Sequence, residues 1–352
     1  MRKLFSLMHM AQHRRALESR ICPEGSIAAF IDFEYHHYAL GDLLTKLVEI
    51  GCAAVEAECT AVDLYVGVDP HRPAAPTQGF ILPENYTFHL DALAPAMLCQ
   101  PMLRSLHFLR DGGLTLGFIR RAAHKIGTPM WPSYSEQINR EVHYPFGHAS
   151  INRHFAKHAS LPRLGAPKGY DIWADAFILE KLANKFIVVV NTRQSQLTPT
   201  PVTTYRDADL SIWNAFFARA QKKYPEVQFL RVGGFSELDN ESFRFENVTA
   251  VRQLGLDLGH ELALMAKSDM FMGTSSGFAT MATFTDIPYL ICNVENYFAG
   301  AAEVKVGDPY PFAIEGQTLL WHEEDADLLF AYLEREVERS HLTRREQLTN
   351  VG

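Results

Sequence analysis

One turn in this sequence has the residues that a phosphate-binding loop needs. An apolar run at 270–272 ends in a turn of small and hydroxylated residues. These residues are Gly273, Thr274, Ser275, Ser276 and Gly277. The segment 278–284 can begin a helix directly after them, and a helix start offers unpaired N–H groups and the positive end of a dipole. The pattern predicts either a phosphate site or a plain turn between a strand and a packed helix.

Two other patterns are typical of metal binding, but each has a simpler interpretation. Asp207 and Asp209 are spaced as in a DxD metal motif, yet they follow TTYR rather than an apolar strand. We interpret them as the acidic first turn of a helix. His154 and His158 are spaced to share a helix face and to bind a metal together. No acidic motif accompanies them, so a polar helix face is favoured and the sequence predicts no metal.

Composition limits the class of protein. The chain has 352 residues, of which 47% are hydrophobic and 21% charged, as in a globular protein long enough for two domains. The formal net charge of -8 argues against a general nucleic-acid-binding protein, which normally has a basic surface. The five cysteines are scattered and include no CxxC pair, which indicates a reducing compartment. We therefore expect a cytoplasmic protein without a nucleic-acid partner.

The amino-terminal segment 1–15 is the part of the sequence that suggests a membrane. No apolar run reaches the roughly 18 residues that a membrane-spanning helix needs. The segment has a charged lead like a signal peptide, but its apolar part is brief and lacks a convincing cleavage site. It would lie on the inner face of an anionic membrane as an amphipathic helix, making peripheral contact, or it would be an ordinary docking helix or frayed terminus.

The elements that must position the turn alternate between strands and helices. In the first half, strand-like runs lie at 27–33, 62–68 and 104–109, with a helical segment at about 42–52. In the second half, strands at 186–191, 227–232 and 248–251 alternate with helices at about 207–224 and 259–267. Such alternation predicts parallel sheets covered by helices.

We therefore expect an α/β protein with two Rossmann-like domains that face a cleft. The amino-terminal domain would span 1–170, with an irregular insert at about 127–169 that is rich in prolines, aromatics and histidines. The carboxyl-terminal domain would span 171–352, and a last charged helix at about 323–340 would be able to pack back on the first domain.

This layout, without a GxGxxG motif after the first strand, resembles the glycosyltransferase-B superfamily, and most of all the heptosyltransferase-like bacterial enzymes. In that family the first strand leads into a Gly-Asp-hydrophobic-hydrophobic turn, and the segment 30–45 here reads FIDFEYHHYALGDLLT. A late strand in that family is followed by a small polar turn ending in Gly, as in FMGTSSG. The chain departs from the family where Ser275 or Ser276 replaces an acidic residue that is usual in this turn.

The resemblance implies a base and a reaction. It makes Asp42 the candidate general base that takes the proton from an attacking hydroxyl, with direct displacement inverting the sugar. The alternative is that Asp42 is the N-cap of a helix. The resemblance also implies a metal-independent transfer without a cofactor, in which a nucleotide sugar is the co-substrate and the acceptor is a glycan, a lipid-linked compound or a protein. Surface polysaccharide synthesis is the process in which such enzymes act.

The donor would bind the second domain. Arg193 follows the strand at 186–191 and Arg206 lies at the start of the next helix, so both guanidinium groups would hold phosphate oxygens. The alternative for each is a solvent-exposed loop arginine. Asp257 and Glu261 precede the phosphate turn and are positioned to contact ribose hydroxyls.

The acceptor would bind the first domain. His36 and His37 lie in the loop before Asp42 and would touch the acceptor or assist proton transfer, or would simply be solvated. The irregular insert offers Tyr144 and Arg153 as acceptor-binding residues. The alternative is an ordinary connection with buried aromatics.

Two other functions fit the same pattern. One is a nucleotide-sugar epimerase or hydrolase with the same two-domain frame, because such enzymes share the late phosphate-binding turn. The other is a noncatalytic carbohydrate-binding subunit that keeps the fold without turnover.

Overall fold

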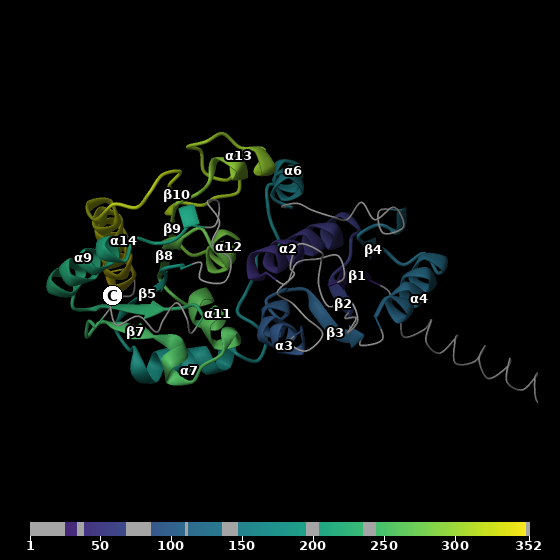
Figure 1. Cartoon of the computed structure of the whole chain (residues 1–352), viewed down its shortest axis with the longest axis horizontal. Helices are drawn as coiled ribbons and strands as arrows, with labels where there is room; N and C mark the ends of the chain where they lie inside the picture. Colours follow the sequence, from purple (N-terminus) through teal and green to yellow (C-terminus); the bar gives the residue numbers. More distant parts are fainter. Residues whose placement is uncertain are drawn as a thin grey trace, which may run out of the picture. The chain divides into compact units, whose positions relative to one another are not determined.

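The computed structural model describes residues 25–33, 39–67, 86–109, 112–135, 147–194, 204–234 and 244–349. These residues divide into two compact units, whose elements are labelled in Figure 1. Unit 1 contains the described residues up to Ala94 and those from Gln100 to Gly147. Unit 2 contains Pro95–Cys99 and the described residues from His148 onward. Each unit has its own parallel sheet with helices, so the predicted α/β class with two Rossmann-like domains is confirmed.

Unit 1 is built on a four-stranded parallel sheet with the order β3-β2-β1-β4. The strands are β1 (Ser26–Asp32), β2 (Ala61–Gly67), β3 (Leu103–Leu109) and β4 (Met130–Trp131). The helices are α2 (Leu40–Glu56), α4 (Gly112–Lys125) and α3 (Tyr86–Met97), of which the end from Pro95 onward belongs to unit 2. All seven residues of β1 are buried, as is typical of a parallel strand covered on both faces.

Unit 2 is built on a six-stranded parallel sheet with the order β10-β9-β8-β5-β6-β7. The strands are β5 (Phe186–Asn191), β6 (Val227–Arg231), β7 (Val248–Ala250), β8 (Met270–Thr274), β9 (Tyr289–Cys292) and β10 (Gln317–Leu319). The helices are α6 (His148–His158), α7 (Asp171–Lys181), α9 (Leu210–Lys223), α11 (Leu258–Ala266), α12 (Gly277–Thr283), α13 (Asn296–Ala302) and α14 (Ala326–Thr349). A short 3-10 helix, η1 (Val251–Leu254), precedes α11.

One face of the unit 2 sheet is covered by α9 and α14, which pack together (Figure 1). Trp213, Phe216 and Phe217 of α9 are completely buried, and the rings of Phe216 and Phe217 contact Phe229 of β6 edge to face. The described part of α14 adds further apolar side chains to this core, including Leu333. The last helix of the chain is therefore part of the core of unit 2.

The segment after α6 is tied to unit 2 by long-range hydrogen bonds. Leu164 N–H donates to the carbonyl of Phe284, and the guanidinium of Arg163 donates to the carbonyls of Thr285 and Phe312. Arg163 also pairs with Asp286, with 2.8 Å between Nε and Oδ1. These contacts hold the proline- and glycine-containing stretch 161–169 against the loop that follows α12.

The order of the strands in unit 2 fixes where a ligand can approach. From β5 the chain first builds β6 and β7 on one side and then returns to build β8, β9 and β10 on the other. In open parallel sheets, ligands bind beyond the carboxyl ends of the strands where the order reverses. Here that point lies between β5 and β8. Among the described residues, no helix is both long and apolar enough to cross a bilayer.

Candidate functional site

The carboxyl ends of β5 and β8 lie side by side, and a glycine at their contact allows the two backbones to approach closely. Asn191, the last residue of β5, is the register partner of Gly273 in β8. A Cβ atom added to Gly273 would lie 2.6 Å from the backbone oxygen of Asn191, which is far inside van der Waals contact. Only glycine therefore allows this close approach of the two strands. The loops that leave β5 and β8 start next to each other.

The predicted phosphate turn joins a strand to a helix but is shorter than expected, because β8 extends through Thr274 and α12 begins at Gly277. Several of its polar groups are engaged within the chain. Ser275 N–H donates to the carbonyl of Cys292 at 2.9 Å, and Ser276 is the N-cap of α12, accepting from Ala279 N–H at 3.2 Å. The N–H groups of Gly277 and Phe278 donate to no acceptor in the described part of the chain. These two donors are the ones that the turn can offer to an anion.

Thr274 is the last residue of β8 and is completely buried. Within the described residues, its hydroxyl has no hydrogen-bond partner. A buried hydroxyl without a partner costs free energy, and a bound oxygen or water at the end of the strand would recover it.

Contacts between three chain segments bring Arg193 and Arg206 to the same edge. Arg193 donates from Nη1 to Oδ1 of Asp207 at 2.5 Å, and its carbonyl accepts from Ala208 N–H at 3.0 Å. Asn293, which follows β9, donates from Nδ2 to the carbonyl of Asp207 at 3.1 Å. The residue before Asn293 is Cys292, whose carbonyl accepts from Ser275 N–H in the predicted phosphate turn. The segment that carries the arginines and this turn are therefore linked through the end of β9.

Arg206 lies at this edge beside an acidic residue. Its Nε is 3.7 Å from Oε2 of Glu295, which follows β9 in unit 2. The side chain of Arg206 is 21% exposed and that of Arg193 is 16% exposed. Each predicted arginine thus has a carboxylate neighbour that fixes its position, and neither is the fully solvated loop arginine of the alternative interpretation.

The DxD sequence precedes α9 rather than forming its acidic first turn as predicted, because α9 begins at Leu210. Asp209 is the N-cap of α9 and accepts hydrogen bonds from the backbone of Ser211 and Ile212. The hydroxyl of Ser211 also donates to it, and these bonds hold the pKa of Asp209 below its ordinary value. Asp207 instead orients Arg193.

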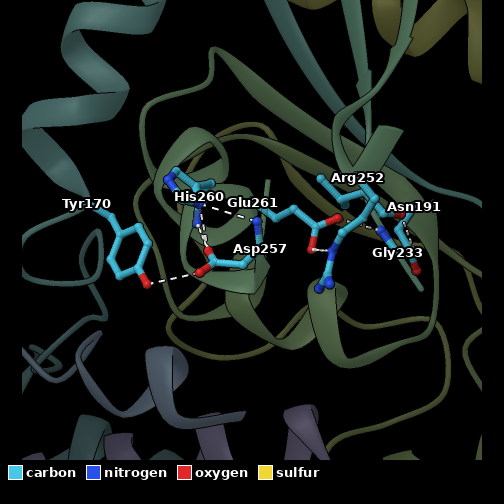
Figure 2. A network of polar contacts seen from close by, with 8 residues as sticks. Tyr170, Asn191, Gly233, Arg252, Asp257, His260 and Glu261 are labelled. Carbon is cyan, nitrogen blue, oxygen red and sulfur yellow. Dashed lines mark hydrogen bonds and ion pairs between the residues drawn. The ribbon is translucent and has the colours of Figure 1, made fainter. Parts of the chain in front are cut away.

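The start of α11 holds the predicted ribose-binding residue Asp257 in a polar network, drawn in Figure 2. Asp257 is the N-cap of α11 and forms a capping box with His260, whose Nδ1 lies 2.6 Å from Oδ1. Tyr170 donates its hydroxyl to the other carboxylate oxygen at 3.1 Å. Burial alone would raise the pKa of Asp257, but the hydrogen bonds and charge of His260 and the bond from Tyr170 lower it overall. Asp257 therefore stays an anion at neutral pH.

Glu261, the other predicted ribose-binding residue, lies deeper in unit 2. Its side chain is completely buried; one oxygen accepts from Gly233 N–H at 3.0 Å and the other from Arg252 Nε at 2.7 Å (Figure 2). Asn191 donates to the carbonyl of Val232 at 2.8 Å, beside the same loop. Glu261 thus fastens α11 to the loop that follows β6, at the carboxyl edge of the sheet.

In unit 1, Asp42 lies in the first turn of α2. The N-cap of this helix is Ala39 and α2 begins at Leu40, so the alternative in which Asp42 is the N-cap is wrong. A carboxylate in the first turn interacts favourably with the helix dipole. Asp32 is the last residue of β1, and its buried carboxylate lies 3.5 Å from the guanidinium of Arg120. The sequence analysis missed this pair, because nothing in the spacing joins residues so far apart.

The predicted acceptor-binding residues are only partly described. His36, His37 and Tyr144 lie outside the described residues, as does the amino-terminal segment 1–24. Arg153 is described: it lies on α6 in unit 2, is exposed, and pairs with Glu303 at 2.8 Å. The rings of His154 and His158 stack on the same helix, with centroids 4.4 Å apart.

Several residues at the carboxyl edge of the unit 2 sheet are not indicated by the sequence. Arg252, Asn191 and the pair of Tyr170 with His260 act through contacts between distant segments. The one signal in the sequence was the Asn at the end of FIVVVN, because a polar residue that ends a buried strand marks its carboxyl edge.

Comparisons with known proteins give similarity in structure alone. No protein-family model and no curated protein sequence matches the chain. One similar solved structure is a family 9 glycosyl transferase from Veillonella parvula, with a TM-score of 0.50 and 10% identity over 86% of this chain and 87% of that chain. Another is the Escherichia coli ADP-heptose LPS heptosyltransferase II, with a TM-score of 0.51 and 10% identity over 90% of this chain and 99% of that chain. The chain therefore has the glycosyltransferase-B fold.

Proposed function

We propose that this chain is a glycosyltransferase that moves a sugar from a nucleotide-diphosphate donor to a hydroxyl acceptor. The observation that carries the proposal is the carboxyl edge of the unit 2 sheet, which we call the donor edge. There, hydrogen bonds link Arg193 to the start of α12 through Asp207 and the end of β9, and Arg206 pairs with Glu295, at the point where the strand order reverses. The fold supports the same function, because the two solved structures above are both glycosyltransferases.

The donor edge has the chemistry that a diphosphate leaving group requires. Two guanidinium groups supply positive charge, and the N–H groups of Gly277 and Phe278 supply neutral donors. A guanidinium has five N–H donors, so Arg193 can keep its bond to Asp207 and still hold a phosphate oxygen. We infer that these groups stabilise the departing diphosphate without a metal ion. The ribose would be held near Asp257, at the start of α11.

Unit 1 would supply the base. Asp42 would accept the proton of the attacking hydroxyl, and direct attack on the anomeric carbon would invert its configuration. The position of Asp42 in the first turn of α2 supports this role, because the helix dipole favours its ionised form and the carboxylate is not used as an N-cap. His36, His37, Tyr144 and Arg153 remain the predicted acceptor-binding residues.

The proposed acceptor is a glycan, a lipid-linked compound or a protein, and the proposed process is synthesis of surface glycans. The proposed location is the cytoplasm, with peripheral contact between the segment 1–15 and the inner face of the membrane. The Escherichia coli neighbour is an ADP-heptose heptosyltransferase, so an ADP-sugar is the first donor to test.

A thermal-shift panel tests the donor site first. ADP, UDP, GDP and CMP are each added to the full chain at a range of concentrations. A ligand at 100 times its Kd stabilises the folded protein by about 2.7 kcal/mol, which gives a measurable rise in Tm. One diphosphate should raise the Tm more than the others and more than CMP. No shift with any nucleotide would contradict the proposed donor site.

Product analysis then tests the reaction. The sugar conjugate of the selected nucleotide is incubated with the chain, with and without an acceptor mixture from a bacterial envelope extract. Transfer predicts nucleotide release that depends on the acceptor. Release or epimerisation without an acceptor would indicate the hydrolase or epimerase instead, and stabilisation without any product would indicate a noncatalytic binding subunit.

A further inference from the structure

Unit 1 has a hollow beside β4 that the proposed chemistry does not use. Its volume is about 740 Å³, and it is open to solvent. Its walls come from the end of α4, the turn before β4, the strand itself and the residues after it; α4 and β4 are labelled in Figure 1. The lining residues are His124, Gly127, Thr128, Met130, Ser133, Tyr134 and Ser135. The volume lies in the range that small-molecule ligands occupy, which is roughly 300–1,000 Å³.

An aromatic pair forms one wall. The rings of His124 and Tyr134 are parallel, with centroids 3.9 Å apart and an interplanar angle of 2°. The stack presets the orientation of Tyr134, whose ring is apolar in its body and polar at its hydroxyl tip. The side chain of His124 is exposed and that of Tyr134 is half-buried. A ligand can therefore reach this wall without rearrangement of the core of unit 1.

Three of the other lining residues carry hydroxyl groups, and Met130 adds an apolar side chain. Ser133 and Ser135 lie within hydrogen-bond distance of each other, with 3.2 Å between their Oγ atoms, and Thr128 adds a third hydroxyl. Gly127 leaves open space, because a Cβ atom added there would have no neighbour within 4 Å. Among the described residues that line the hollow, none is a lysine, an arginine or a carboxylate. Such a lining does not favour a phosphate, which would need positive charge.

We propose that this hollow binds one ring of a neutral sugar. A pyranose has an apolar C–H face and a rim of hydroxyls, and the hollow offers an aromatic side chain together with hydroxyl groups that both donate and accept. If the proposed function is right, the hollow would hold one sugar ring of the acceptor on unit 1, whereas the donor would bind unit 2. The binding itself does not require that the chain transfers sugars. Few contacts are available to a single ring, so the Kd would be on the order of 1 mM.

Ligand-observed NMR on the full chain tests the proposal. The probes are the methyl pyranosides of glucose, galactose, mannose and N-acetylglucosamine, each at about ten times that Kd, and saturation transfer from the protein to their C–H protons is measured. At least one pyranoside should give a signal with the wild-type chain. Tyr134→Ala should reduce that signal at least five-fold, because it removes the aromatic wall. Ser135→Trp should do the same by filling the hollow, and it removes no core contact.

Phe118→Ala is the matched control, because Phe118 is exposed on α4 and does not line the hollow. Its signal should equal that of the wild type. The proposal is overturned if no pyranoside binds the wild type, or if the signal survives in both Tyr134→Ala and Ser135→Trp. Because nucleotide binding is measured separately, a failure here leaves the donor site standing, and a failure of the donor site leaves this test intact.

Discussion

Replacing Gly273 by alanine tests whether the close approach of β5 and β8 builds the donor edge. The new Cβ would lie 2.6 Å from the backbone oxygen and 3.2 Å from the backbone nitrogen of Asn191, and 3.0 Å from the ring of Phe271. Carbon atoms in contact are normally about 3.5–4.0 Å apart. The neighbouring atoms of Asn191 belong to a central strand and cannot rotate away, so β5 and β8 must move apart.

The cost follows from this displacement. Overpacking of a filled interior destabilises a protein by about 1–3 kcal/mol. The substitution also weakens the backbone hydrogen bonds between the strands at the register pair Asn191–Gly273. We therefore expect Gly273→Ala to cost about 2–3 kcal/mol, the upper part of this range. At roughly 2–4 °C per kcal/mol for a domain of this size, the Tm should fall by about 4–12 °C. The turn that follows Gly273 moves with β8, so the affinity for a nucleoside diphosphate should fall at least about ten-fold, or about 1.4 kcal/mol.

Differential scanning calorimetry measures the first effect and isothermal titration with ADP, or with the nucleotide that the panel selects, measures the second. The control is Gly165→Ala, also in unit 2, because a Cβ there would meet no atom within 4 Å. Its Tm should be unchanged or slightly raised. Equal Tm values for Gly273→Ala and Gly165→Ala would show that the contact between Gly273 and Asn191 is not tightly packed. A lower Tm with unchanged nucleotide affinity would refute the position of the site.

Three further substitutions test the base, a buried ion pair and the network around α11. Asp42→Asn should lower stability by no more than about 1 kcal/mol, measured by urea unfolding, because the interaction of a first-turn carboxylate with the helix dipole is of this size; initial-rate assays should show transfer reduced about 10²–10⁴-fold. Asp63→Asn should cost roughly 1–3 kcal/mol at pH 7, measured by urea unfolding, because Arg104 loses its partner. Glu261→Gln should cost about 2–3 kcal/mol by urea unfolding, whereas Glu303→Gln, which breaks an exposed pair, should cost less than about 1 kcal/mol.

The Asp63 effect has a defined pH dependence. Burial alone would raise the pKa of Asp63, but its bonds to Arg104, Ser105 and Ser26 outweigh burial and lower the pKa from the ordinary value of 3.8. The carboxylate therefore stabilises the fold above pH 3.8, and this stability is lost as the pH falls through the lowered folded-state pKa. The wild type and Asp63→Asn should differ at pH 7 and converge below pH 3.8. A constant difference down to pH 2.5 would contradict this assignment.

The predictions for Asp42→Asn and Glu261→Gln would be contradicted by the following results. Normal transfer by Asp42→Asn would remove it as the base. A loss of stability beyond about 3 kcal/mol in that variant would show that its role is structural rather than that of a first-turn carboxylate. If Glu261→Gln and Glu303→Gln were equally stable, the buried carboxylate would not be holding α11 to the loop after β6.

The fold could be predicted from the sequence where patterns are local. FIVVV is a continuous apolar run and, with the Asn that ends it, becomes the fully buried strand β5, and the segment at 278–284 becomes α12 almost residue for residue. The small residues also predicted a connection between a strand and a helix, although Gly273 and Thr274 belong to β8 and Gly277 to α12. These features depend on the neighbours of each residue along the chain, so a single sequence contains them.

The parts that could not be predicted depend on contacts between distant segments. Nothing local shows that LPRLGAPKG is held to the loop after α12 by Arg163, or that Glu261 is completely buried beside Arg252. The two-residue strand β4 is too short to show an alternation of apolar and polar residues. Asp42 was open to an N-cap interpretation because Ala39, which has no capping side chain, gives no sequence signal of a helix start.

The central claim is that unit 2 holds a diphosphate at the carboxyl edge of its sheet, and the ratio of two affinities tests it most directly. Isothermal titration compares ADP with AMP, or the corresponding pair for the base that the panel selects, in the wild type and in Arg193→Gln. We predict that the diphosphate binds the wild type at least about ten-fold more tightly than the monophosphate, and that Arg193→Gln narrows this ratio to about two-fold. A ratio that is unchanged in Arg193→Gln would contradict the account.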